Sequence, residues 1–98
     1  MKVFISQPMR DKTNEEIYKE RRVVITKLKL KYSEPITVID SFIESAPHNA
    51  NPLWYLSESI KKLGDADIAL FCKDWELYRG CVIEHECAVR YGIKCEYA

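Results

Sequence analysis

A chain of 98 residues is long enough for one small domain and too short for two. Its 15 basic and 15 acidic side chains give a formal net charge of zero, which argues against recruitment of a nucleic acid polymer or an anionic membrane by an overall field. No apolar stretch approaches the roughly 20 residues of a membrane span, and the amino terminus opens directly into a predicted strand. We therefore expect a cytoplasmic protein.

The amino-terminal third predicts a strand followed by a helix. Residues 2–6 form an apolar run typical of a strand covered on both faces, and Pro8 ends its pairing. Thr13 and Glu16 then match the capping box of a helix. The apolar side chains of this helix recur on one stripe, namely Ile17, Val24, Ile25 and Leu28. Pro35 follows where the pattern fades.

The middle of the chain predicts a second strand and a second helix. The strand covers residues 36–39, and Asp40 at its carboxyl end is a candidate ligand-binding residue. Residues 41–51 have no period, and a loop of this length in a small domain is typical of a functional segment. We expect it to form part of a pocket wall. Asn51 and Pro52 are typical of a helix cap and a first helical residue.

The last third predicts strand, loop, helix and strand. Residues 68–72 form a short apolar run typical of a buried parallel strand, and the polar residues 73–79 follow as a loop. From Gly80 onward, apolar side chains recur at helical spacing: Val82, Ile83, Cys87 and Val89. Gly92 suits the left-handed end of this helix, and residues 93–97 predict an edge strand.

The resulting order βαβαβαβ is typical of a parallel sheet with helices on both faces. We predict a single domain over residues 1–98, with a small three-layer flavodoxin-like or Rossmann-like fold and strand order 2-1-3-4. Such sheets bind ligands at the carboxyl ends of the strands, where the strand order reverses. The loops and helix start expected there supply the candidate residues Ser6, Gln7, Met9, Arg10, Asp74, Trp75, Tyr78 and Glu84.

Several candidates admit both a functional and a structural interpretation. Glu84 lies in the first turns of the third predicted helix, where the helix dipole favours an ionised side chain, and acidic residues are enriched there for that reason alone. Arg10 can hold an anion with two donors or be an exposed loop arginine. Trp75 and Tyr78 can stack on a planar base, cap the core or form a subunit interface.

Common cofactor and metal motifs are missing from the sequence. There is no GxGxxG dinucleotide fingerprint and no GKS or GKT phosphate loop. His48 and His85 have no recognised ligand spacing to a cysteine, so we expect no metal and no cofactor. The cysteines form no CxxC pair and are predicted to be buried thiols: Cys72, Cys81, Cys87 and Cys95.

Three features together resemble the nucleoside 2-deoxyribosyltransferase superfamily, in particular its small bacterial and phage relatives. They are the strand ending in ISQPMR, the aspartate before an apolar run at Asp67-Ile68, and the segment GCVIEHECA, residues 80–88, followed by Tyr91-Gly92-Ile93. The resemblance covers nearly the whole chain. Its most specific part is a glycine, a glutamate and an alanine spaced four residues apart, Gly80, Glu84 and Ala88.

The resemblance implies that Glu84 is the nucleophile that attacks the anomeric carbon of a deoxyribonucleoside and displaces the base. Arg10 matches an arginine that contacts phosphate in relatives that hydrolyse deoxynucleoside monophosphates. The chain also departs from the family. Ser59 stands where the transferases have an acid that holds the sugar, Tyr78 where the family has an acid or a serine, and Gln7 where a glycine is usual.

Two main classes of function are therefore expected. One is an enzyme of N-glycosidic bonds, either a nucleoside 2-deoxyribosyltransferase or a deoxynucleoside 5′-monophosphate N-glycosidase. The other is a non-catalytic binder that sequesters or senses a nucleotide-derived ligand such as an ADP-ribose compound. A vestigial pocket on a protein that works through partner proteins is a third. A homo-oligomer is expected, because an edge strand and four aromatic residues leave much surface to bury: Trp54, Tyr55, Trp75 and Tyr78.

Overall fold

The computed structural model describes residues 1–39 and 46–98. The elements in chain order are β1 (Lys2–Ser6), α1 (Asn14–Lys31), β2 (Thr37–Val38), α2 (Pro52–Leu63), β3 (Ile68–Phe71), the short 3₁₀ helix η1 (Trp75–Leu77), α3 (Arg79–Arg90) and β4 (Lys94–Tyr97). The four strands form one parallel sheet of order β2-β1-β3-β4. The predicted α/β class and the flavodoxin-like strand order are confirmed.

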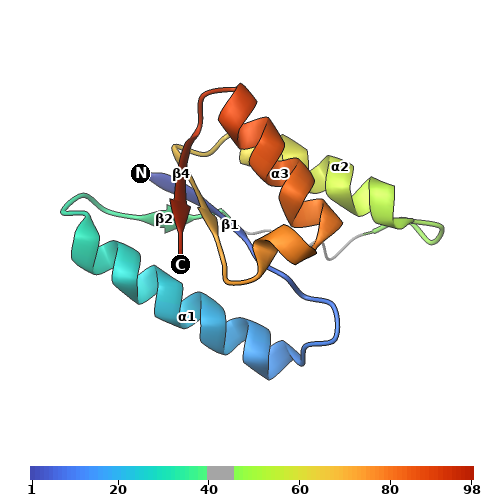
Figure 1. Ribbon diagram of the computed structural model, residues 1–98, viewed down its shortest axis with the longest axis horizontal. Helices are drawn as coiled ribbons and strands as arrows, with labels where there is room; N and C mark the ends of the chain where they lie inside the picture. Colours follow the sequence, from blue (N-terminus) through green and yellow to red (C-terminus); the bar gives the residue numbers. More distant parts are fainter. Residues whose placement is uncertain (40–45) are drawn as a thin grey trace.

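Helices cover both faces of the sheet, as predicted. Side chains alternate along a strand, so Val3 and Ile5 of β1 pack towards α1, whereas Phe4 packs towards α2 and α3. Figure 1 shows α1 on one side of the sheet and the pair α2 and α3 on the other. By the same alternation Ser6, the last residue of β1, belongs to the side of Phe4, which directs it towards α3.

Local capping signals set where α1 and α2 begin. Thr13 Oγ1 accepts from the backbone N–H of Glu16 at 3.1 Å, and the Glu16 carboxylate accepts from the backbone N–H of Thr13 at 3.2 Å, which is the predicted capping box. Asn51 Oδ1 accepts from the N–H of Trp54 at 2.8 Å at the start of α2. None of the helices formed by the described residues is both long and apolar enough to cross a membrane.

The apolar stripe predicted for α3 was wrong at three positions, although its fourth residue, Cys87, packs against the core. Val82 and Ile83 are each 41% exposed and Val89 is 55% exposed, whereas the buried positions of α3 are Cys81, Glu84 and Ala88. The side chains of Cys81 and Ala88 are small, which lets a helix approach the sheet closely. This orientation turns Glu84, a polar residue, towards the interior of the domain.

Candidate functional site

A cavity of about 850 Å³ lies at the carboxyl end of β1, and α2 and α3 form the rest of its wall. This volume is in the range typical of small-molecule sites. The lining residues come from β1 and the loop after it, from the cap and first half of α2, and from the start of α3. They are Phe4, Ile5, Ser6, Gln7, Pro8, Met9, Asn51, Pro52, Leu53, Tyr55, Leu56, Ser59, Tyr78, Arg79, Gly80, Cys81, Ile83 and Glu84.

Glu84 is a buried carboxyl group in this wall. The residue is 8% exposed, and its Oε1 accepts a hydrogen bond of 2.8 Å from Ser6 Oγ, which is itself buried. The two residues are 78 positions apart in sequence. They meet because β1 ends beside the second turn of α3 and both side chains lie on the same side of the sheet.

Burial dominates the protonation of Glu84. Loss of hydration raises the pKa of this carboxyl from 4.5 to about 7, while the hydrogen bond from Ser6 opposes the rise. The sequence left open whether the helix dipole keeps this carboxylate ionised, and in the structure burial instead favours its protonated form. The helix begins at Arg79, so Glu84 lies in its second turn, beyond the range over which the dipole acts strongly. The carboxyl therefore gains and loses its proton near neutral pH.

The thiol of Cys81 lies one helical turn before Glu84 and also lines the cavity. Burial raises the pKa of this thiol, and a hydrogen bond with Ser6 partly opposes the rise. A protonated thiol is a weak nucleophile. Among the three neighbouring polar groups, Glu84 is therefore the one suited to acid, base or nucleophilic chemistry at neutral pH.

Tyr78 and Gly80 shape the cavity wall at the start of α3. The guanidinium carbon of Arg10 lies 5.9 Å from the centroid of the Tyr78 ring, within the range of a cation–π contact. At Gly80 the backbone is helical, and a Cβ would meet no atom within 4 Å. The backbone does not require glycine here, and the missing side chain leaves space beside the cavity.

Most of the predicted ligand-binding residues converge on this cavity. Those in the wall are Ser6, Gln7, Met9, Ser59, Tyr78, Gly80 and Glu84. Arg10 is exposed and reaches the wall through its contact with Tyr78. Asp40 lies outside the described residues, as do residues 41–45 of the loop that was predicted to form a pocket wall. Asn51, at the end of that loop, does line the cavity.

Asp74 and Trp75 are absent from the cavity wall formed by the described residues, although the sequence placed them in the crevice. Asp74 is exposed and has a φ of 67°, and the 3₁₀ turn that follows it directs Trp75 towards β4. The Trp75 ring lies 4.2 Å from the ring of His85 and 5.4 Å from that of Phe71, measured between centroids. Trp75 therefore covers the core near β4, which is one of the alternatives left open from the sequence.

The sequence did not predict Tyr55, Arg79 or Cys81 as residues of the site, although all three line the cavity. For Tyr55 and Cys81, helical spacing could have indicated a place in the site. Tyr55 lies one turn before Ser59, and Cys81 lies one turn before Glu84, so each shares a helix face with a predicted residue. Arg79 directly precedes Gly80 and brings a positive charge to the wall.

No group of three or more metal-ligating side chains that could hold an ion occurs within residues 1–39 and 46–98. Comparison of the chain with protein-family models, with curated proteins and with solved structures gave no match. The resemblance to the nucleoside 2-deoxyribosyltransferase superfamily therefore stays a prediction that depends on the motifs alone.

Proposed function

We propose that the cavity binds a nucleoside or nucleotide and that Glu84 acts on its N-glycosidic bond. One observation carries the proposal: a carboxyl group buried in the wall of a ligand-sized cavity, held by Ser6 and with a pKa of about 7. Perturbed carboxyl groups of this kind are typical of catalytic sites. The position of Glu84 in the GCVIEHECA segment, where the resemblance predicts a nucleophile, adds support from the sequence.

In the proposed reaction the ionised Glu84 attacks the anomeric carbon of the sugar. A carboxylate oxygen forms a bond to that carbon as the bond from carbon to the base nitrogen breaks, and the base leaves with the electron pair and takes up a proton. The carboxylate also stabilises the positive charge that develops on the sugar. A second base or a water molecule then displaces the sugar from Glu84 and restores the carboxylate.

The raised pKa of Glu84 predicts how this reaction depends on pH. Because a nucleophile must be ionised, the rate rises with pH through about 7, where about half of the carboxyl groups have lost their proton. An exposed glutamate would already be ionised at pH 6. Tyr78, with Arg10 against its ring, offers a planar surface on which the base can stack.

A second candidate function is binding without turnover, for example of an ADP-ribose compound. Among the described residues that line the cavity, Glu84 carries the single carboxyl group. Glycosidic bond cleavage commonly uses two carboxyl groups, one of them as the acid for the leaving group. A chain with the nucleophile alone is suited to holding a ligand that it does not cleave.

A chromatographic assay separates the two functions. The purified protein is incubated with a panel of deoxynucleosides and deoxynucleoside 5′-monophosphates, with and without a second free base, and the products are resolved. The matched variants are Glu84→Ala and Glu86→Ala, because Glu86 lies on the same helix but is exposed and pairs with Arg90. We expect base release or exchange by wild type and by Glu86→Ala, and none by Glu84→Ala.

The alternative predicts a different set of results. If the protein only binds, no base is released, but an ADP-ribose compound or a nucleotide raises the melting temperature by mass action. Base release that persists in Glu84→Ala contradicts the proposed role of this residue. If no member of the panel releases its base and none raises the melting temperature, both functions are contradicted.

Self-association is a further part of the proposal. Apolar side chains stay exposed on the outer surface of α2 and α3, namely Leu53, Val82, Ile83 and Val89. Large exposed apolar side chains on a small domain are candidates for burial in an interface, and Leu53 and Ile83 also line the cavity. We expect a homo-oligomer in sedimentation velocity at micromolar concentration. A monomer alone under these conditions would remove this part of the proposal.

A further inference from the structure

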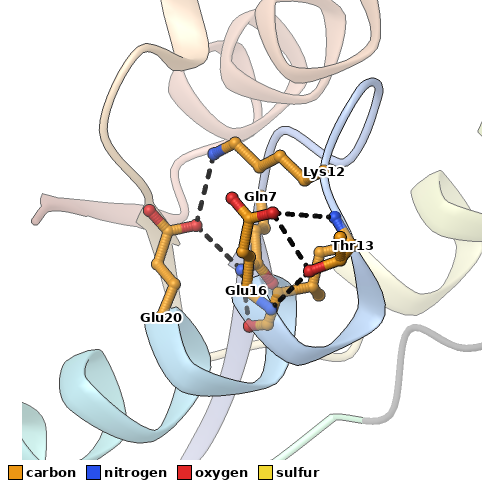
Figure 2. A network of polar contacts seen from close by, with 6 residues as sticks. Gln7, Lys12, Thr13, Glu16 and Glu20 are labelled. Carbon is orange, nitrogen blue, oxygen red and sulfur yellow. Dashed lines mark hydrogen bonds and ion pairs between the residues drawn. The ribbon is translucent and has the colours of Figure 1, made fainter.

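The carboxylate of Glu20 on α1 contacts both ends of the loop that joins β1 to α1. At the start of the loop, Gln7 Nε2 donates to Glu20 Oε1 at 2.8 Å and to the carbonyl of Ile17 at 2.9 Å. At its end, Lys12 Nζ lies 3.8 Å from the same Glu20 oxygen. Figure 2 shows the two contacts converging on Glu20 from opposite ends of the loop.

The orientation of the buried Gln7 side chain is fixed by its two partners. Both the Ile17 carbonyl and the Glu20 carboxylate accept hydrogen bonds, so the amide nitrogen must face them and the flipped amide would place an oxygen against two acceptors. The bond to the Glu20 carboxylate is partly buried, and hydrogen bonds to a charged group are among the stronger ones. The more exposed contact with Lys12 adds little by itself. The bond from Gln7 is therefore the main way in which Glu20 holds the loop.

The residues between the two ends form a tight turn. The backbone N–H of Lys12 donates to the carbonyl of Met9 at 3.2 Å, and Asp11 has a φ of 65°, in the left-handed region. The capping box at Thr13 then starts α1. A turn closed in this way moves as one piece, so its position depends on how its ends are attached.

This loop contributes to the cavity. Met9 lies in the wall, and Arg10 places its guanidinium against the ring of Tyr78, which is also in the wall. Glu20 itself is not among the lining residues. A continuous set of contacts thus leads from Glu20 through Gln7 and the loop to the Arg10–Tyr78 pair.

We propose that Glu20 is a positioning residue: by holding Gln7 and Lys12, it sets the place of Arg10 against Tyr78 and thereby the affinity of the cavity for a nucleotide. This inference rests on the proposed function, because it assumes that a nucleotide occupies the cavity. It adds a residue outside the cavity, on the helix that covers the opposite face of the sheet.

The test measures binding of deoxyadenosine 5′-monophosphate by calorimetry. We expect Glu20→Ala to raise Kd about tenfold, within the range of coupling between residues of one hydrogen-bond network. Glu20→Gln keeps an oxygen that can accept from Gln7, so we expect its Kd to change less than about twofold. Glu15→Ala is the matched control, because it removes an exposed carboxylate near the start of the same helix.

A double-mutant cycle separates positioning from a general loss of structure. If Glu20 acts through Arg10, the Glu20→Ala substitution has less than about a twofold effect on Kd in an Arg10→Ala background. The same fold-change in both backgrounds overturns the inference. Equal Kd values for wild type and Glu20→Ala overturn it too, while leaving the proposed function in place.

Limited trypsinolysis tests the hold on the loop without any ligand. Trypsin cleaves after Arg10 and Lys12, and we expect faster cleavage at both sites in Glu20→Ala than in wild type, because local opening governs access. Unchanged cleavage contradicts the inference. Wild type that binds neither a deoxynucleoside nor a deoxynucleoside 5′-monophosphate of the panel in calorimetry overturns the proposed function and this inference together. That result is distinct from the failure of the Glu20 variants alone.

Discussion

Replacement of Glu84 by glutamine is predicted to stabilise the protein, and the gain should depend on pH. In the folded protein the pKa of Glu84 is raised from 4.5 to about 7. A carboxyl group with a raised pKa binds its proton more tightly in the folded than in the unfolded chain. The contribution of this proton to the free energy of unfolding is therefore complete below pH 4.5, falls as the pH rises towards 7, and is absent above 7.

The size of the effect follows from the two pKa values. Each pH unit between them corresponds to about 1.4 kcal/mol, so deprotonation of Glu84 lowers the free energy of unfolding by about 3 kcal/mol between pH 4.5 and 7. A domain of this size has a total stability of roughly 5–15 kcal/mol. Glutamine resembles the protonated carboxyl and does not titrate. The advantage of Glu84→Gln over wild type should grow from near zero at pH 4.5 to about 3 kcal/mol at pH 8.

Urea denaturation of both proteins, followed by circular dichroism from pH 4.5 to 8.5, measures this difference. Other titrating groups are common to both proteins and cancel in the comparison. Glu86→Gln is the control: Glu86 is exposed and pairs with Arg90, so its replacement should change stability by less than about 0.5 kcal/mol at any pH. A constant difference between Glu84→Gln and wild type over this range would refute the reasoning, because it would mean that burial does not perturb the carboxyl.

Three further predictions follow from the geometry of the cavity. Gly80→Ala should raise stability by roughly 0.5–1 kcal/mol, because alanine is the better helix former and its Cβ meets no atom within 4 Å, yet it should weaken nucleotide binding in calorimetry. Unchanged binding would show that ligands do not approach Gly80. Ser6→Ala removes the hydrogen bond that lowers the pKa of Glu84, so the midpoint of the pH–rate profile should move above about 7. A midpoint that moves to lower pH would contradict this assignment. Trp75→Leu should lower the melting temperature, because the indole packs on Phe71, and should leave the Kd for nucleotides unchanged. A raised Kd would place Trp75 in the site after all.

The fold was predictable because its signals are local and agree with one another. The apolar runs of β1 and β3 are short and uninterrupted, which is typical of central strands buried on both faces. Thr13 and Asn51 cap their helices as the sequence suggests. Once the alternation of strands and helices is known, few topologies remain, and the order β2-β1-β3-β4 is among the common ones.

The orientation of α3 was not predictable from hydrophobic periodicity. Its apolar residues Val82 and Val89 face outward, whereas its interior side consists of small or polar side chains, including Ala88 and Glu84. Periodicity assumes that the most apolar face is the buried one. That assumption fails where small side chains let a helix approach a sheet closely and where a buried carboxyl group lines a cavity.

The candidate site was predictable where strand ends and motif spacing determine position. Ser6 ends the first strand and Glu84 follows the helix-opening glycine, and both lie in the cavity. Of the loop after β3, Tyr78 lines the cavity as predicted, whereas Asp74 and Trp75 do not. A 3₁₀ turn, which cannot be foreseen from the composition of the loop, carries Trp75 towards β4. The pKa of Glu84 depends on burial, which no local pattern reports.

The most direct test of the central claim is to look for the sugar on Glu84. The protein is incubated with the deoxynucleoside or deoxynucleotide that releases base in the chromatographic assay, quenched, and measured by intact-mass spectrometry. Cleavage after Arg79 and Arg90 yields a tryptic peptide that contains both Glu84 and Glu86. The proposed mechanism predicts an adduct on this peptide in wild type and in Glu86→Ala, deoxyribosyl from a deoxynucleoside or 5-phosphodeoxyribosyl from a deoxynucleotide, and no adduct in Glu84→Ala. An adduct that survives in Glu84→Ala, or base release by that variant at the wild-type rate, would contradict it.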